Sequence, residues 1–204
     1  MYKILINMEK NQYWKRKYNN YFKEIKKEYL ILNGNYDWKR EYLRVKKFNY
    51  WSEMEENRIH LDFSNLGIRE IPKEIGNLVK LRDLDCPYNK IKEIPKELGN
   101  LINLRSLDLS FNNIKVIPEE VTKLDNLEYL LLIDNKITEI PKEINKLKKL
   151  KGLDFTYNKI KEIPEEINNL NNLEYLNLSN NGMSKIPIKF FKSGCLFLMI
   201  NKEI

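Results

Sequence analysis

The chain has 204 residues, 42% of them hydrophobic and 32% charged, so it is long enough to bury a core and polar enough to stay in solution. Its two cysteines, Cys86 and Cys195, are too few for a disulfide framework or a cysteine-based metal site, which fits a reducing, cytoplasmic location. The net charge of +7 is uneven, because residues 1–57 carry 13 Lys or Arg against 8 Asp or Glu, whereas residues 58–187 carry 20 of each. No apolar run approaches the roughly 20 residues that cross a bilayer, and we expect neither a secretory signal nor a membrane span.

Residues 1–57 are predicted to form an α-helical region that caps the repeats beginning at residue 58. Apolar residues recur every three or four positions from Trp14 to Leu32, which places them on one face of a helix. The Asn-Gly-Asn segment at 33–35 ends this helix, and a second helical stretch covers residues 38–48. The first repeat has an apolar end that such a cap would cover.

A 23-residue pattern, LxxLxLxxNxIxxIPxxIxxLxx, recurs in six copies over residues 58–190. The LxxLxL part alternates as a half-buried strand does, so Leu107 and Leu109 are predicted to point into the core. Parallel strands stack about 4.8 Å apart, and stacking buries an apolar face that no single repeat can bury alone. Residues 191–204 are predicted to be an incomplete last repeat or cap, with Leu196 and Met199 in register with a seventh strand.

Two further columns complete each repeat. An asparagine after the strand is predicted to satisfy backbone groups as the chain turns, and Leu66 replaces it in the first copy. The proline of the Ile-Pro pair suits the first turn of a helix, and a glutamate two residues later lies near the positive end of that helix. The asparagines are Asn89, Asn112, Asn135, Asn158 and Asn181, and the prolines are Pro72, Pro95, Pro118, Pro141 and Pro164.

These motifs resemble the leucine-rich-repeat superfamily, in particular its 23-residue intracellular class, which has Ile-Pro or Leu-Pro in every repeat. The resemblance implies an α/β fold, namely a right-handed solenoid with a parallel β-sheet on its concave face and short helical segments on its convex face. It also implies a protein-interaction scaffold, because the concave face usually binds proteins in this class.

The third, fifth and seventh positions of each repeat are predicted to face outward on the concave side. The fifth position is Asp in four repeats, and the fourth repeat interrupts this acidic column with an apolar patch. An apolar centre with an acidic rim is typical of a protein-binding surface, with aromatic side chains as anchors. The alternative is that the aspartates serve only the scaffold and its solubility. The predicted partner-binding residues are Tyr129, Leu131, Ile133, Tyr175, Asp85, Asp108 and Asp154, and the aromatic residues Tyr88, Phe111 and Tyr157 lie just beyond the strands.

The sequence does not indicate an enzyme, a cofactor or a metal site. The only histidine, His60, has Asp62 beside it on the same strand face but no positioned nucleophile. Cys86 occupies a core strand position and is expected to be a packed side chain. The seven glycines form no phosphate-binding loop.

Two alternative functions rest on the N-terminal region. The segments Trp14-Lys-Arg-Lys-Tyr18 and Trp38-Lys-Arg-Glu-Tyr42 resemble the stretch after the core motif in F-box proteins. This resemblance implies a substrate receptor of a cullin-type ubiquitin ligase. Basic residues interleaved with Trp and Tyr can also contact nucleic acid, although a solvated helix face explains them more simply.

Overall fold

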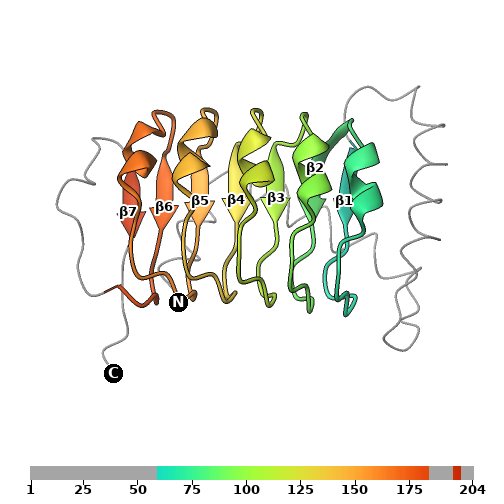
Figure 1. Ribbon diagram of the computed structural model, residues 1–204, viewed down its shortest axis with the longest axis horizontal. Helices are drawn as coiled ribbons and strands as arrows, with labels where there is room; N and C mark the ends of the chain where they lie inside the picture. The colour runs from blue at the N-terminus through green and yellow to red at the C-terminus, as the bar shows by residue number, and fades with distance from the viewer. Residues whose placement is uncertain (1–58, 184–194, 199–204) are drawn as a thin grey trace. The chain divides into compact units, whose positions relative to one another are not determined.

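The computed structural model describes residues 59–183 and 195–198, which form a parallel β-sheet backed by short helices (Figure 1). The α-helical cap expected at residues 1–57 lies outside the described residues. Seven strands pair in chain order: β1 (Ile59–Asp62), β2 (Leu81–Asp85), β3 (Ser106–Asp108), β4 (Tyr129–Leu131), β5 (Gly152–Asp154), β6 (Tyr175–Asn177) and β7 (Leu196–Leu198). Between the first six strands lie five short helices: η3 (Lys73–Asn77), η4 (Lys96–Asn100), η5 (Glu119–Lys123), η6 (Lys142–Lys146) and η7 (Glu165–Asn169).

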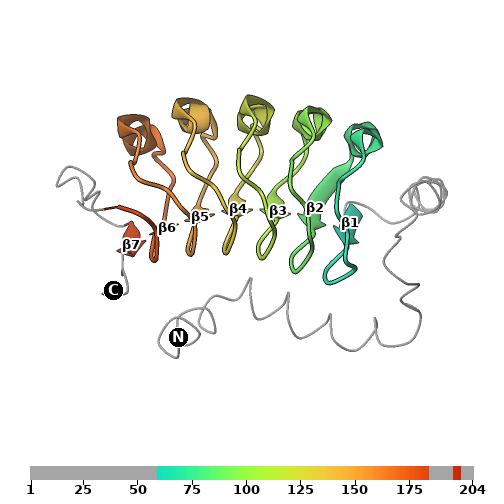
Figure 2. The same cartoon turned by 60° about the horizontal axis from the view of Figure 1, so that its bottom comes forward.

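The sheet register follows the 23-residue period. From β2 to β6, each leucine at the fourth position of a repeat lies opposite the equivalent leucine of the next, as Leu84 does with Leu107 and Leu107 with Leu130. The strands line the inner side of an arc and the helices fan out along its outer side (Figure 2). The predicted parallel sheet is therefore confirmed.

The helices on the outer side are five-residue 3-10 helices, with i→i+3 hydrogen bonds. Each begins one residue after its proline, which is the N-cap residue with an extended ψ and lies one position before the place predicted for it. The carbonyl of Pro72 accepts the N–H of Ile75 at 3.0 Å, which closes the first turn. The glutamates do lie in the first turn, as Glu74 and Glu97 show.

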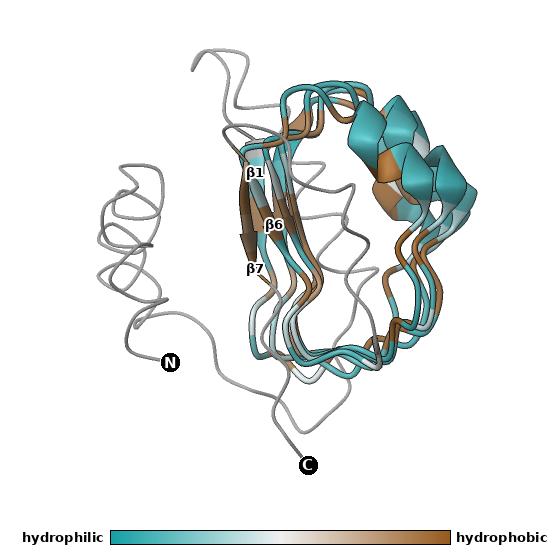
Figure 3. Cartoon of the chain, turned by 90° about the vertical axis from the view of Figure 1, so that its left-hand side faces the viewer, coloured by the Kyte–Doolittle hydropathy of each residue, from teal (hydrophilic) through white to brown (hydrophobic). Residues whose placement is uncertain are grey.

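The core fills the space between the strand wall and the helix wall (Figure 3). Leu107 and Leu109 are fully buried, as predicted, and so is Cys86 at the position equivalent to Leu109. Each leucine or isoleucine removed from water in this way contributes about 1.5–3 kcal/mol. The interior is continuous from repeat to repeat, because no repeat closes on itself.

The asparagine column links consecutive repeats through backbone groups. The side-chain amide of Asn112 donates to the carbonyls of Cys86 at 2.9 Å and Leu109 at 3.0 Å, and its oxygen accepts the N–H of Ile91 at 2.9 Å. The carbonyl of Leu109 also accepts the amide of Asn135, so neighbouring asparagines share an acceptor. This arrangement confirms the structural role predicted for the column.

The seventh strand has a different register from the one predicted. Leu196 lies opposite Tyr175 and Phe197 opposite Leu176, so the spacing from β6 to β7 is 21 residues and not 23. Phe197 therefore packs against the core, whereas Leu196 is exposed. The physical reason is that the repeat pattern decays after Pro187, and the largest apolar side chain of the segment takes the inward position. Met199 lies outside the described residues.

Gly99 lies where two successive helices come close together. A Cβ built on Gly99 would be 2.6 Å from the backbone oxygen of Glu120 in η5, a distance that backbone movement alone can relieve. We expect Gly99→Ala to lower the free energy of unfolding by about 1–3 kcal/mol in denaturant titration. Gly182→Ala is the matched control, because its nearest backbone oxygen is 3.6 Å away, and equal losses in the two variants would contradict this account.

Candidate functional site

The concave face carries the outward positions of the repeats in register. The fifth positions of β1 to β6 lie opposite one another across the sheet, in the order Asp62, Asp85, Asp108, Leu131, Asp154 and Asn177. The predicted site residues Asp85, Asp108, Leu131 and Asp154 therefore lie side by side on successive strands. Tyr129, Gly152 and Tyr175 are adjacent in the third-position column.

Most of the acidic residues have a role in the backbone turn that ends each strand. The carboxylate of Asp62 accepts the N–H of Ser64 at 2.7 Å, and that of Asp108 accepts the N–H of Ser110 at 3.0 Å. Asp154 accepts the N–H of Thr156 at 2.8 Å in the same way. These bonds satisfy an amide as the chain leaves the sheet, so the acidic column is partly scaffold.

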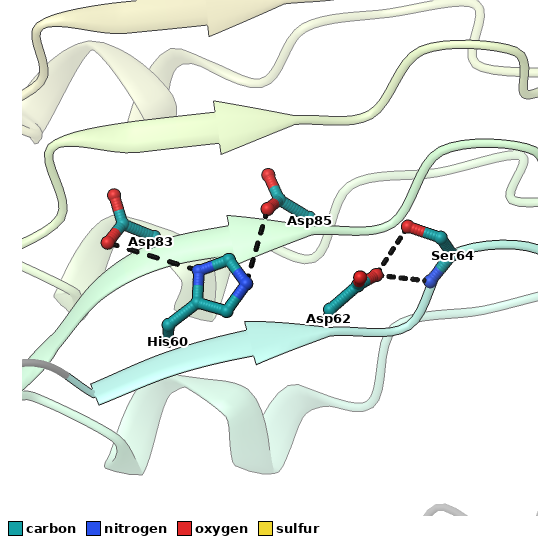
Figure 4. Close-up of polar contacts among 5 residues, drawn as sticks. All are labelled: His60, Asp62, Ser64, Asp83 and Asp85. Carbon is teal, nitrogen blue, oxygen red and sulfur yellow. Dashed lines mark hydrogen bonds and ion pairs between the residues drawn. The ribbon is translucent and has the colours of Figure 1, made fainter. Parts of the chain in front are cut away.

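Asp85 differs from the other aspartates because residue 87 is a proline and has no N–H to donate. Its carboxylate oxygen lies 3.4 Å from Nε2 of His60, and a carboxylate oxygen of Asp83 lies 3.9 Å from Nδ1 of the same ring (Figure 4). Asp62 faces away from the ring toward Ser64. His60 and Asp85 therefore link β1 to β2 on the concave face. The hydroxyl of Ser64 in Figure 4 donates to Asp62 and not to His60 or Asp85.

The fourth strand interrupts the polar column as predicted. The ring of Tyr129 lies against the strand of the next repeat, where a Cβ on Gly152 would be 2.8 Å from a ring carbon. The absence of a side chain at Gly152 thus makes room for the aromatic ring. Leu131 lies between Asp108 and Asp154 in the register, and Ile133 follows two residues later, half-buried.

Leu131 is outside the continuous core yet retains only 5% of its exposure. Asp85 and Asp154, at the same position of other repeats, retain 4% each. The fifth position is therefore sheltered whether it holds a leucine or a carboxylate. The more accessible members of the predicted site are Asp108, Tyr129, Ile133 and Tyr175, all of which are half-buried.

Tyr175 and Asp154 form a hydrogen-bonded network beside the apolar patch. The hydroxyl of Tyr175 donates to the Asp154 carboxylate at 2.9 Å and accepts the side-chain amide of Asn177 at 2.9 Å. Burial raises the pKa of Asp154, and the hydrogen bonds from Thr156, Tyr175 and Asn177 offset part of that rise. Burial and the nearby Asp154 carboxylate raise the pKa of Tyr175, so its hydroxyl remains a donor.

The raised pKa of Asp154 predicts a pH-dependent stability. In the window between the ordinary pKa of an aspartate and the raised one, the folded state binds more protons than the unfolded state. Lowering the pH from 7 into that window should therefore increase the contribution of Asp154 to stability. We expect Asp154→Asn to remove this contribution while keeping an oxygen for the Thr156 N–H, as Asn177 does for Ser179. Unfolding titrations from pH 7 to 4 measure it, and an unchanged pH dependence in the variant would contradict the assignment.

The structure also shows a stacked aromatic pair just beyond the ends of strands β2 and β3. Tyr88 and Phe111 directly precede the asparagine column, and their rings stack with centroids 4.3 Å apart. Both residues have positive φ, 58° and 57°. Nothing in the repeat pattern distinguishes these positions from ordinary turn residues, which is why sequence analysis missed the stacking.

Cys86, which directly follows β2, is a packed side chain, as predicted. It is fully buried, and burial together with the carboxylates of Asp85 and Asp108 raises the pKa of its thiol. Among residues 59–183 and 195–198, no group of His, Cys, Asp and Glu side chains has the arrangement of a metal site. Within the same ranges, no helix has the length and apolar character needed to cross a bilayer.

Comparison with protein-family models assigns the chain to a family. A model described as "Leucine rich repeat" matches residues 79–137, 102–150 and 125–183, which together cover just over half of the chain. The chain belongs to the leucine-rich-repeat family. No match was found among curated proteins.

Several solved structures share the fold. A plant peptide hormone receptor, RGFR1 in complex with RGF2, is 38% identical over 61% of this chain and 21% of its own, with a TM-score of 0.57. An internalin from Listeria monocytogenes is 27% identical over 66% of this chain and 38% of its own, with a TM-score of 0.57. A plant ice-binding protein is 28% identical over 61% of this chain and 42% of its own, with a TM-score of 0.56. The matched region thus spans less than half of each of these chains.

Proposed function

We propose that the chain is a protein-interaction scaffold that binds a protein partner on the concave face, centred on strand β4. The observation that carries this proposal is the apolar interruption at Tyr129, Leu131 and Ile133, in which Leu131 lies in register between Asp108 and Asp154. Scaffold needs explain Asp108 and Asp154, because both accept turn amides. They do not explain a leucine where four other repeats place an aspartate.

The geometry around β4 suits an aromatic anchor. The ring of Tyr129 is held against the backbone of Gly152, so little conformational entropy is lost when a partner packs on it. Tyr175, on the other side of Gly152, is fixed by its bond to Asp154. Two oriented tyrosines beside an apolar patch provide the kind of rigid contact that dominates protein interfaces.

One of the solved relatives binds a polypeptide. The plant receptor that is 38% identical over the matched region was solved with its peptide hormone RGF2. We extend from this relative only the general use of leucine-rich repeats as a surface for polypeptide ligands. The identity of the partner of this chain is left to experiment.

Affinity capture with matched variants tests the proposal. The full chain, Leu131→Asp, Ile133→Asp and Val116→Asp serve as baits in extracts of native cells, with captured proteins quantified by mass spectrometry. Val116 is the control, since it is an exposed apolar residue outside the strands. We expect a partner that the wild type and Val116→Asp retain and that both β4-region variants lose. Identical captures by all four baits would contradict the concave-face proposal.

A ubiquitin-ligase substrate receptor is the second candidate. It rests on the paired Trp-Lys-x-x-Tyr segments at 14–18 and 38–42, which lie outside the described residues. In this case the captured proteins would include cullin-ligase subunits, and Trp14→Ala with Trp38→Ala would remove these subunits while leaving the concave-face partner bound. Retention of both classes by this double variant would argue against the receptor.

We further propose an intracellular location. Cys86 is a free thiol deep in the core. Free thiols are typical of proteins in a reducing compartment. Fractionation of native cells with an antibody against the chain tests this, and recovery in the culture medium would contradict it.

A further inference from the structure

One column of residues at the end of the strands adopts the left-handed backbone conformation in every described repeat. Its members have φ between 51° and 58° and directly precede the asparagine positions: Asn65, Tyr88, Phe111, Asp134, Tyr157 and Asn180. We call them the left-handed column. Asparagine adopts this conformation readily, whereas bulky aromatic residues do so rarely. The two end repeats use asparagine, and the inner repeats use Tyr, Phe, Asp and Tyr.

Backbone bonds fix the column in a regular ladder. The N–H of Asn89 bonds to the Phe111 carbonyl at 3.1 Å, and that of Asn112 to the Asp134 carbonyl at 3.2 Å. The N–H of Asn135 bonds to the Tyr157 carbonyl at 3.2 Å. Because φ and these bonds repeat, the side chains leave the backbone in equivalent directions at each step.

The aromatic members present their rings along this ladder. Tyr88 and Phe111 have parallel rings with an interplanar angle of 5°. Tyr88 keeps 56% of its exposure and Tyr157 keeps 42%, whereas Phe111 is half-buried. The left-handed conformation belongs to every repeat, but aromatic residues adopt it at a cost that a solubility role does not explain.

Asp134 occupies the step between Phe111 and Tyr157. Strands are roughly 4.8 Å apart, so the backbones of Phe111 and Tyr157, two steps apart, are separated by about 10 Å, and a cation midway has room within about 6 Å of both rings. The exposed Asp134 carboxylate is at the same step. A planar guanidinium can stack on aromatic faces and pair with a carboxylate at once, which an ammonium does less well.

The space between Phe111 and Tyr157, which we call the slot, has charged residues around it. Asp108 lies on β3, three residues before Phe111, and adds negative charge toward the concave face. Lys136 and Lys159 follow the column by two residues, where the N–H of Lys136 bonds to the Ile114 carbonyl at 2.8 Å. The two lysines offset the charge of the two aspartates, but a nucleic-acid phosphate between the rings would meet the exposed Asp134 carboxylate directly, which disfavours an anion at that step.

We propose that the left-handed column docks an extended, arginine-bearing segment of a protein partner, with a guanidinium held between Phe111 and Tyr157 and paired with Asp134. This inference rests on the proposed function in one respect, namely that the ligand is a polypeptide. It concerns the left-handed column, which lies beyond the ends of the strands, and not the patch on strand β4.

Fluorescence anisotropy with the full chain tests the slot. The probe is a fluorescein-labelled (Gly-Ser-Arg)4 peptide, and the matched peptide has citrulline, which is isosteric and neutral, in place of arginine. We expect Asp134→Lys and Phe111→Asn each to weaken binding of the arginine peptide at least about tenfold, since each removes one of the contacts. Phe111→Asn is designed to fold, because Asn65 and Asn180 occupy the same position in the end repeats.

Three controls decide between the outcomes. Asp125→Lys makes the same change of charge at an exposed site outside the column, and it should leave binding within about twofold. Equal weakening by Asp125→Lys and Asp134→Lys, equal binding of the citrulline peptide, or no binding of the arginine peptide would each overturn the proposal. Leu131→Asp leaves the column intact and should still bind the peptide, so failure of the β4 proposal and failure of this one are distinguishable.

Discussion

Replacing Asn112 by alanine is expected to lower the free energy of unfolding by about 2–4 kcal/mol. The change leaves the buried N–H of Ile91 without its acceptor, and a buried unsatisfied donor costs about 1–3 kcal/mol. It also removes the amide donated to the carbonyls of Cys86 and Leu109. Those carbonyls keep a second donor from Asn89 and Asn135, so their loss adds less than a full bond each.

Urea titration followed by circular dichroism measures this loss. Asn103→Ala is the matched control, because Asn103 makes a single exposed bond of 2.8 Å to the Val79 carbonyl. The control should lose less than about 1 kcal/mol. If the two variants lost the same amount, the asparagine column would not be the link between repeats that the bonds indicate.

Leu130→Asp and Leu131→Asp are expected to lower the free energy of unfolding by very different amounts although the residues are neighbours. Leu130 is fully buried in the core, where an unpaired carboxylate and a lost apolar side chain should cost more than about 4 kcal/mol and unfold the domain. Leu131 lies outside the core cluster, at a position where Asp85 and Asp154 are equally sheltered. An aspartate there should cost about 1.5–3 kcal/mol, the value of the lost apolar burial, because the position already shelters a carboxylate in other repeats.

Thermal unfolding of the two variants beside the wild type checks the pair. The aspartates of β1, β2 and β3 already lie in one row, so a longer acidic row has a precedent in the same sheet. Unfolding of both variants would place Leu131 in the core and remove the basis of the β4 patch. Folding of both would instead contradict the assignment of Leu130 to the interior.

The repetitive part of the fold could be predicted from sequence because one physical constraint recurs. Leu107 and Leu130 occupy the same position of a 23-residue period, and stacking is the only way to bury them, so the parallel sheet and its register follow. The asparagine column followed from the same logic, since turning backbone needs partners. The family match over residues 79–183 agrees with these repeats.

Features that break the period could not be predicted in the same way. The β7 register depends on which apolar side chain packs best in a segment where the repeat pattern has decayed. Phe197 takes the place expected for Met199. A 3-10 helix differs from an α-helix in having i→i+3 in place of i→i+4 hydrogen bonds. The spacing of apolar residues over only five positions does not distinguish the two. The extended ψ of Pro72 then places it before the helix.

The candidate site was predictable as a face but not as a set of contacts. Strand alternation places Tyr129 and Leu131 in outward columns, yet only the three-dimensional structure shows the Tyr129 ring against Gly152. The Asp-x-Ser and Asp-x-Thr pairs are present in the sequence, but their hydrogen bonds are known only from the structure. Asp108 accepts the N–H of Ser110, whereas Asp85 has no such donor because the residue two positions later is a proline. The stacking of Tyr88 on Phe111 could not be predicted without the backbone φ values of these two residues.

Photo-crosslinking tests the central claim most directly. Tyr129 is replaced by p-azidophenylalanine, which is close to tyrosine in shape, and Val116 outside the strands receives the same residue as a control. After illumination in native cells, the account predicts a crosslinked species of higher mass from position 129 and none from position 116. Crosslinking from position 116 alone would contradict binding on the concave face.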